Sequence, residues 1–167
     1  GRMRAIAAPI MAMALVAAPA ASAQSMNIPL ITRVTLTEIC GPWLQTGDLA
    51  AAVQAGIAAD YRAAPNLNPA NPPSFVVLDG SLTHRGRVVL INDNDQVCSV
   101  DMAEAGVIQL SDLAAETLTA LGMSRVFVQG GATLGVIVWA GEDRQAVIAP
   151  SDRSSGAAIT LSWRRRD

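Results

Sequence analysis

The sequence predicts an α+β protein in which two helices pack on a mostly antiparallel sheet of about six to seven short strands, with one disulfide bond. Two observations predict this class. Short runs rich in Val, Ile and Leu alternate with segments containing Gly, Pro, Asn and Asp, as short strands and turns do. Two longer segments instead space their apolar residues as one face of a helix. The order is helix, three strands, helix, four strands. The two halves share no residue identity, so we interpret this repetition as a likeness of architecture only.

Residues 1–23 are interpreted as a cleaved signal peptide and not as part of the fold. Two arginines precede an Ala-rich apolar stretch, and Ala21-Ser22-Ala23 gives the small-x-small pattern that signal peptidases cut. Cleavage between Ala23 and Gln24 would leave one globular domain, residues 24–167, in the periplasm or outside the cell. An uncleaved anchor and an ordinary N-terminal helix are the alternatives, although two prolines make the stretch a poor membrane span.

Composition narrows the classes of partner. Without residues 1–23 the chain carries arginine but no lysine, and its net charge is about −4. A mildly acidic domain lacks the basic face that neutralises phosphates, so no nucleic-acid partner is expected. The basic cluster Arg164-Arg165-Arg166 is interpreted as a solvated C-terminal tail. Aromatic residues make up only 4% of the chain, which predicts an aliphatic core and few platforms for stacking bases or sugars.

The chain has two cysteines, Cys40 and Cys98. In an oxidising compartment they favour one disulfide, which would close a loop of about 58 residues and stabilise the fold by roughly 4 kcal/mol in the chain-entropy model. The run Cys40-Gly41-Pro42-Trp43 also resembles the thioredoxin motif Cys-Gly-Pro-Cys over three residues. Trp43 stands where the second cysteine of that redox pair would be. A redox-active Cys40 and two free buried thiols are the alternatives to a structural disulfide.

The first predicted helix covers Asp48–Ala64. Its apolar stripe repeats every four residues, and Thr46 or Asp48 can cap its N-terminus. Gly56 is expected to mark a close contact, because a glycine inside a helix destabilises it by about 1 kcal/mol relative to Ala. Residues 24–39 fit either a strand or the start of a helix, and Gly41-Pro42 is expected to interrupt regular structure there. The apolar stripe consists of Leu49, Val53, Ile57 and Tyr61.

A proline-rich surface loop, Pro65–Pro73, is expected to end this helix and to lead into the strands. Gly80–Gly86 joins the first two strands, and Asn92–Asp95 favours a tight hairpin between the second and third. After the third strand, Ser111 and Asp112 can cap a second helix that runs to Leu121 and ends at Gly122. The predicted strands are Phe75–Asp79, Arg87–Ile91, Gln96–Val100, Arg125–Gln129, Leu134–Ala140, Gln145–Ala149 and Ala157–Trp163.

Motifs that would carry catalysis, a metal or a cofactor are weak. His84 is the single histidine and lies in the predicted Gly80–Gly86 loop, and the chain has no Gly-x-Ser-x-Gly elbow to hold a nucleophilic serine. Asp93, Asp95 and Asp101 could offer oxygens to calcium, but they lack the spacing of an EF-hand. The Gly-rich run 130–135 precedes a predicted strand, whereas a phosphate-binding loop opens a helix. We therefore predict no catalytic, cofactor-binding or metal-binding residues.

These observations predict a small exported protein that acts as a non-catalytic binding or accessory module of the bacterial envelope. Its partner would be an envelope protein or another envelope component, bound without a cofactor, and its oligomeric state is left open. The alternative is an envelope enzyme, either a hydrolase that uses His84 or a thiol-dependent enzyme that uses Cys40. The Pro65–Pro73 and Gly80–Gly86 loops, which flank one strand, are the first surfaces to which a partner is expected to bind.

Overall fold

A computed structural model describes residues 27–63, 75–130 and 135–164 of the chain. The predicted signal peptide, its cleavage site between Ala23 and Gln24, and the Pro65–Pro73 loop lie outside these residues. Within them the α+β class is confirmed: helices pack on one antiparallel sheet, and a disulfide joins Cys40 to Cys98. None of the described helices is both long and apolar enough to cross a membrane.

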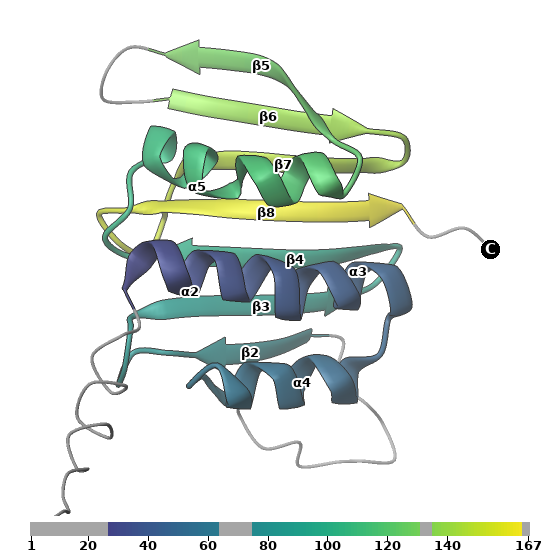
Figure 1. Cartoon of the computed structure of the whole chain (residues 1–167), viewed down its shortest axis with the longest axis vertical. Coiled ribbons are helices and arrows are strands. Elements are labelled where there is room, and N and C mark those ends of the chain that lie inside the picture. Colours follow the sequence, from purple (N-terminus) through teal and green to yellow (C-terminus); the bar gives the residue numbers. More distant parts are fainter. Residues whose placement is uncertain (1–26, 64–74, 131–134, 165–167) are drawn as a thin grey trace, which may run out of the picture.

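The sheet has eight described strands in the order β1-β2-β3-β4-β8-β7-β6-β5, and every neighbouring pair is antiparallel. Each half of the chain forms four consecutive antiparallel strands that start at one edge of the sheet, and the last strands of the two halves, β4 and β8, pair in the centre (Figure 1). The strands are β1 Arg62–Ala63, β2 Phe75–Asp79, β3 Gly86–Asn92, β4 Asp95–Met102, β5 Ser124–Gly130, β6 Gly135–Gly141, β7 Arg144–Pro150 and β8 Ala157–Arg164.

All seven predicted strands are confirmed to within two residues at their ends, and the prediction of six to seven strands falls one short. The additional strand, β1, has only two residues and pairs with β2. It lies inside the segment predicted as the first helix, because that helix, α4 (Leu49–Ala58), ends earlier than predicted. Asp60 has a positive φ of 64°, and this left-handed residue turns the chain from the helix into β1.

The prediction of two helices is also too low, because residues 28–46 form a further helical stretch. It consists of α2 (Ile28–Val34), the π-helical turn η1 (Thr35–Cys40) and α3 (Gly41–Thr46). Gly41-Pro42 therefore does not interrupt regular structure. The N–H of Gly41 donates to the carbonyl of Leu36, five residues back, so the chain is already in a wide π turn where Pro42, which has no N–H, enters the first turn of α3.

The helix α5 (Val107–Ala120) begins five or six residues before the start that a cap at Ser111 or Asp112 predicts. Gly106 is the residue at its N-cap, in place of Ser111 or Asp112. Ser111 is buried in the helix and accepts a hydrogen bond from the indole Nε1 of Trp139 at 3.1 Å. The predicted glycine at the C-terminus is confirmed, since Gly122 has a φ of +84°.

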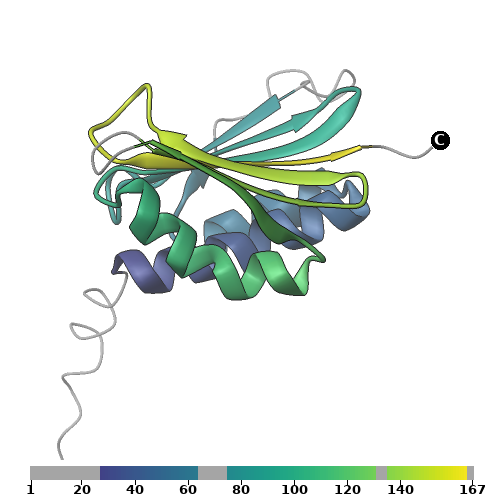
Figure 2. The same ribbon diagram turned by 90° about the horizontal axis from the view of Figure 1, so that it is seen from above.

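The core lies between the helices and one face of the sheet. Figure 2 shows all the described helices on the same side of the strands. Alternate strand residues, such as Val88, Leu90, Cys98 and Val100, point into this layer and are fully or almost fully buried. In α4 the predicted stripe is displaced: Ile57 is 49% exposed, whereas the small residues Ala52 and Gly56 face the sheet.

Candidate binding surface on the open sheet face

The second face of the sheet is not covered by any described helix (Figure 2). Its residues alternate with the buried ones and are half-buried, because neighbouring strands shield them laterally but no described helix lies above them. One row of cross-strand partners runs over six strands, and we call its surroundings the open face. This row consists of Val77, Val89, Ser99, Thr160, Val147 and Val138.

The centre of the open face is polar and its flanks are apolar. The hydroxyls of Ser99 and Thr160 lie 3.2 Å apart across the β4–β8 pair and share a hydrogen bond. Val89 lies beside Ser99 on one side, and Val147 lies beside Thr160 on the other. Such a surface can pack against apolar groups of a partner while it offers hydroxyls as donors or acceptors.

A second row, one pleat away, alternates in charge. Arg62, Asp79, Arg87 and Asp101 are direct partners across the strands from β1 to β4. The Ser81 backbone N–H donates to Asp79 and lowers the pKa of this carboxyl, assisted by the Ser81 hydroxyl and the positive charges of Arg87 and Arg62. The row is nearly neutral in sum, so it does not form a site for a strongly charged ligand.

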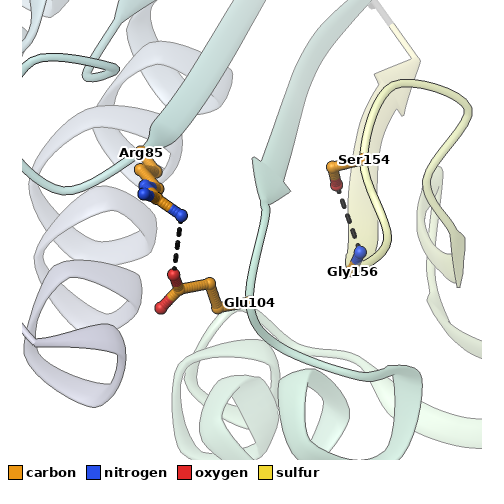
Figure 3. A network of polar contacts seen from close by, with 4 residues as sticks. All are labelled: Arg85, Glu104, Ser154 and Gly156. Carbon is orange, nitrogen blue, oxygen red and sulfur yellow. Dashed lines mark hydrogen bonds and ion pairs between the residues drawn. The ribbon is translucent and has the colours of Figure 1, made fainter.

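Asp101 organises the loop between β7 and β8. The hydroxyls of Ser151 and Ser154 both donate to its carboxylate. The Ser151 hydroxyl oxygen in turn accepts from the backbone N–H of Arg153 and of Ser154. The Ser154 oxygen accepts from the N–H of Gly156 at 3.2 Å, the contact drawn in Figure 3. The partly buried carboxylate of Asp101, on the central strand β4, thus holds this surface loop in one conformation.

A hollow of about 260 Å³ lies where this loop meets the open face. Its floor is formed by the ladder residues of β3, β4, β7 and β8, and Arg153 of the loop lines its rim. The guanidinium Nε of Arg87, which also lines it, is buried and has no hydrogen-bond partner among the described residues.

His84 is held by the backbone on both of its ring nitrogens. The N–H of Gly86 donates to Nδ1 at 3.1 Å, so Nε2 carries the hydrogen and donates to the Ala59 carbonyl at 3.0 Å. Burial lowers the pKa of His84, although the Ala59 carbonyl and the charge of Asp60 act in the opposite direction. The ring also contacts Tyr61. Burial raises the pKa of that tyrosine to about 12, although its hydrogen bond to Thr35 acts in the opposite direction.

A surface hollow does lie beside His84, lined also by Arg85, Glu104 and Gln109. Arg85 and Glu104 form an ion pair of 3.0 Å in it (Figure 3), and both side chains are more than half exposed. The imidazole therefore has polar neighbours, but neither of its nitrogens is free to take a proton from a substrate without giving up a backbone contact.

Cys40 is bonded to Cys98, and both residues are fully buried. The bridge fastens η1 to the helix-facing side of β4. Beside it, the Trp43 indole donates to the Val97 carbonyl at 3.0 Å, and the Gln96 amide donates to the Trp43 carbonyl at 2.8 Å. The three residues that resemble the thioredoxin motif thus lie in a helix–sheet contact and include no free thiol.

The candidate calcium oxygens are not brought together. Asp95 begins β4, whereas Asp101 lies near its other end and is engaged by the two serines. In the described part of the chain, no three His, Cys, Asp or Glu side chains cluster as metal ligands do. The Asn92–Asp95 hairpin between β3 and β4 is confirmed.

The open face was missed in the sequence, although one signal was present. In most of the predicted strands, neighbouring residues differ in burial, but the sequence alone does not say which of the two alternating sets faces the helices. The charged row could not be found without the register, which brings Arg87 opposite Asp101 across 14 positions of sequence. Comparisons with protein-family models, with curated proteins and with solved structures find no match to this chain.

Proposed function

We propose that this chain is an exported, non-catalytic binding module of the bacterial envelope, and that the open face of its sheet is the recognition surface. The observation that carries the proposal is the absence of any described helix over that face, while all the described helices pack on the opposite face. A sheet face with half-exposed valines and a central hydroxyl pair offers the apolar core and polar contacts of a protein interface.

The partner is a protein or another envelope component with an apolar, uncharged surface that carries a few hydrogen-bonding groups. The charged row supports this chemistry, because its alternating signs leave little net field to attract an ion. Arg153 at the rim of the hollow offers hydrogen-bond donors to a partner that presents a carbonyl or hydroxyl there.

The contacts of His84 and Cys40 favour this proposal over the enzyme alternative. A hydrolase would need His84 to exchange a proton, and both of its nitrogens bond to the backbone. A thiol enzyme would need a thiolate, and Cys40 is in a buried disulfide.

Export is supported by the predicted signal peptide and by this disulfide, because such bonds persist in oxidising compartments. Mass spectrometry of the native protein, unreduced, tests it. We expect an N-terminus at Gln24 and a mass lower by two hydrogens than that of the reduced chain. A native protein that keeps residues 1–23 and has both thiols reduced would contradict the proposed location.

Recognition by the open face can be tested with a photo-crosslinking residue placed at Val89 or, as a control, at Ile57. Val89 lies in the hollow, whereas Ile57 is 49% exposed on α4, in the helical layer. The partner cross-linked through Val89 is identified, purified and titrated against the wild type, Val89→Arg and Ile57→Lys. We expect Val89→Arg to weaken its binding at least tenfold and Ile57→Lys to leave it unchanged.

Equal binding of the partner by both variants would exclude the open face as the recognition surface. Hydrolysis of an envelope substrate by the purified protein, lost in His84→Gln but not in Val89→Arg, would favour the enzyme alternative instead. Circular dichroism of each variant verifies that it is folded, so that loss of binding is not loss of structure.

A further inference from the structure

The strand β5 is an outer edge of the described sheet and is exposed along its whole length. It pairs with β6 on one side and is last in the strand order, so the N–H and C=O groups on its other side face outward (Figure 1). All seven of its residues are exposed. Three consecutive apolar side chains stand out: Val126 is 59% exposed, Phe127 49% and Val128 59%.

This edge lacks most of the features that keep edge strands from pairing. The opposite edge, β1, has two residues, one of which is an arginine. In contrast, β5 has seven residues, no proline and a single charged side chain, Arg125. A bulge between Arg125 and Phe127 is its one protective feature, and the strand pairs regularly with β6 from Phe127 to Gly130. An edge of this length and composition is a template for another strand.

The sequence of β5 is complementary to itself. If two copies pair antiparallel about a two-fold axis at Phe127, the exposed apolar residues of one copy, Val126 to Val128, meet those of the other. Val126 then lies opposite Val128, and the two Arg125 side chains lie at opposite ends of the pair, so like charges do not face each other. Other strands could pair with the same backbone, but this match in size and charge favours an identical strand.

We infer that β5 binds β5 of a second copy of this chain, so that two sheets join edge to edge into one. The contact is separate from the open face and leaves that face free in both copies. A pair of seven-residue strands covers less area than the roughly 1,200 Å² of a stable interface. We therefore expect a weak, reversible dimer with a Kd on the order of 0.1 mM.

Sedimentation of the purified, disulfide-bonded protein from about 5 µM to about 1 mM tests this inference. We expect the sedimentation coefficient to rise with concentration in the wild type. Val128→Lys should weaken the dimer at least tenfold, because it adds a charge to the exposed edge. Ile57→Lys, which adds the same charge at a site with 49% exposure on α4, should dimerise as the wild type does.

A cysteine variant tests which strand forms the contact. The two native cysteines are already joined, so Phe127→Cys introduces one reactive thiol. A short thiol-specific cross-linker should join two Phe127→Cys chains at least tenfold faster than two Ile57→Cys chains. A wild type that stays monomeric at about 1 mM would overturn the inference, as would equal cross-linking rates. A monomer that loses a different protein partner in Val128→Lys would also overturn it and assign β5 to that partner.

Discussion

The imidazole of His84 packs edge-on against the ring of Tyr61, with the ring centroids 4.5 Å apart and the planes inclined by 72°. The two residues join the end of α4 to the 80–86 loop. Gly80 and Gly86 allow this contact, because a side chain at either position would meet the imidazole. The only histidine of the chain is thus a packing element whose neutral form makes all of its contacts.

We predict that stability falls as the pH decreases below about 6.5, the ordinary pKa of histidine. The folded protein lowers the pKa of His84, so the unfolded chain binds the proton more readily and protonation favours unfolding. The stabilisation that comes from neutral His84 is complete above pH 6.5. It is lost as the pH falls from there to the lower pKa that His84 has in the folded protein. Urea unfolding at several pH values measures it.

His84→Gln is the control for that experiment. It should be less stable than the wild type at neutral pH by about 1–2 kcal/mol and should have a flatter stability profile between about pH 5 and 7. The carboxyl of Asp79, whose pKa is also lowered, changes the stability only below about pH 3.8, so it does not affect the comparison between about pH 5 and 7. A variant with the same slope as the wild type would show that another group is responsible.

Removal of the disulfide should destabilise the fold by roughly 4 kcal/mol, because the unfolded chain regains the entropy of a 58-residue loop. The double variant Cys40→Ala/Cys98→Ala, compared with the wild type in chemical denaturation, measures this difference. Addition of a reductant to the unfolded wild type, followed by refolding, should reproduce the loss. Reductant should have no effect on the double variant, and a response there would point to an unrelated cause.

Gly56→Ala should destabilise the protein by about 1 kcal/mol in spite of the higher helix propensity of alanine. A Cβ at Gly56 would lie 2.7 Å from Cδ1 of Leu78, which is fully buried in β2. Thermal unfolding measures the change. In a Leu78→Ala background the same substitution should become neutral or stabilising, because the obstructing methyl groups are gone. Equal effects in both backgrounds would exclude the steric explanation.

Asp101→Asn should loosen the β7–β8 loop. An amide oxygen accepts more weakly than a carboxylate, so the hydroxyls of Ser151 and Ser154 lose their anchor. Hydrogen exchange at the backbone amides of Arg153 and Gly156 should accelerate about tenfold, which corresponds to roughly 1.4 kcal/mol. Asp95→Asn, at the other end of β4, should leave this exchange unchanged.

Local signals were sufficient for the strands. Each predicted run is bounded by turn residues, such as Asn92–Asp95, whose preferences do not depend on the rest of the fold. The Cys40–Cys98 bond could be predicted because the chain has only two cysteines. The helix from residue 28 to 46 could not, because Thr35, Ile39 and Pro42 are weak helix formers that packing holds in place.

The candidate site depends on strand order and register, which are not local. Whether Val89 and Val147 face solvent or a second layer is decided by the side on which the helices pack. The sequence of each strand alternates in the same way whichever side that is, so it cannot decide between the two. The hydrogen bonds that occupy His84 come from Ala59 and Gly86, on different elements. A sequence pattern could place His84 in a loop but could not show that its nitrogens were occupied.

The position of β8 has a consequence for the timing of folding. This strand, residues 157–164, lies between β4 and β7 in the middle of the sheet, and Cys98 of β4 is paired with Leu161. As the polypeptide emerges in sequence order, the first helices and the β2–β4 meander can form and be cross-linked by the disulfide. The inner side of β4 then stays unpaired until the last strand arrives. Assembly of the continuous sheet is therefore a late event. A chain that stops before residue 157 would lack β8 and would leave the inner edges of β4 and β7 without a partner strand.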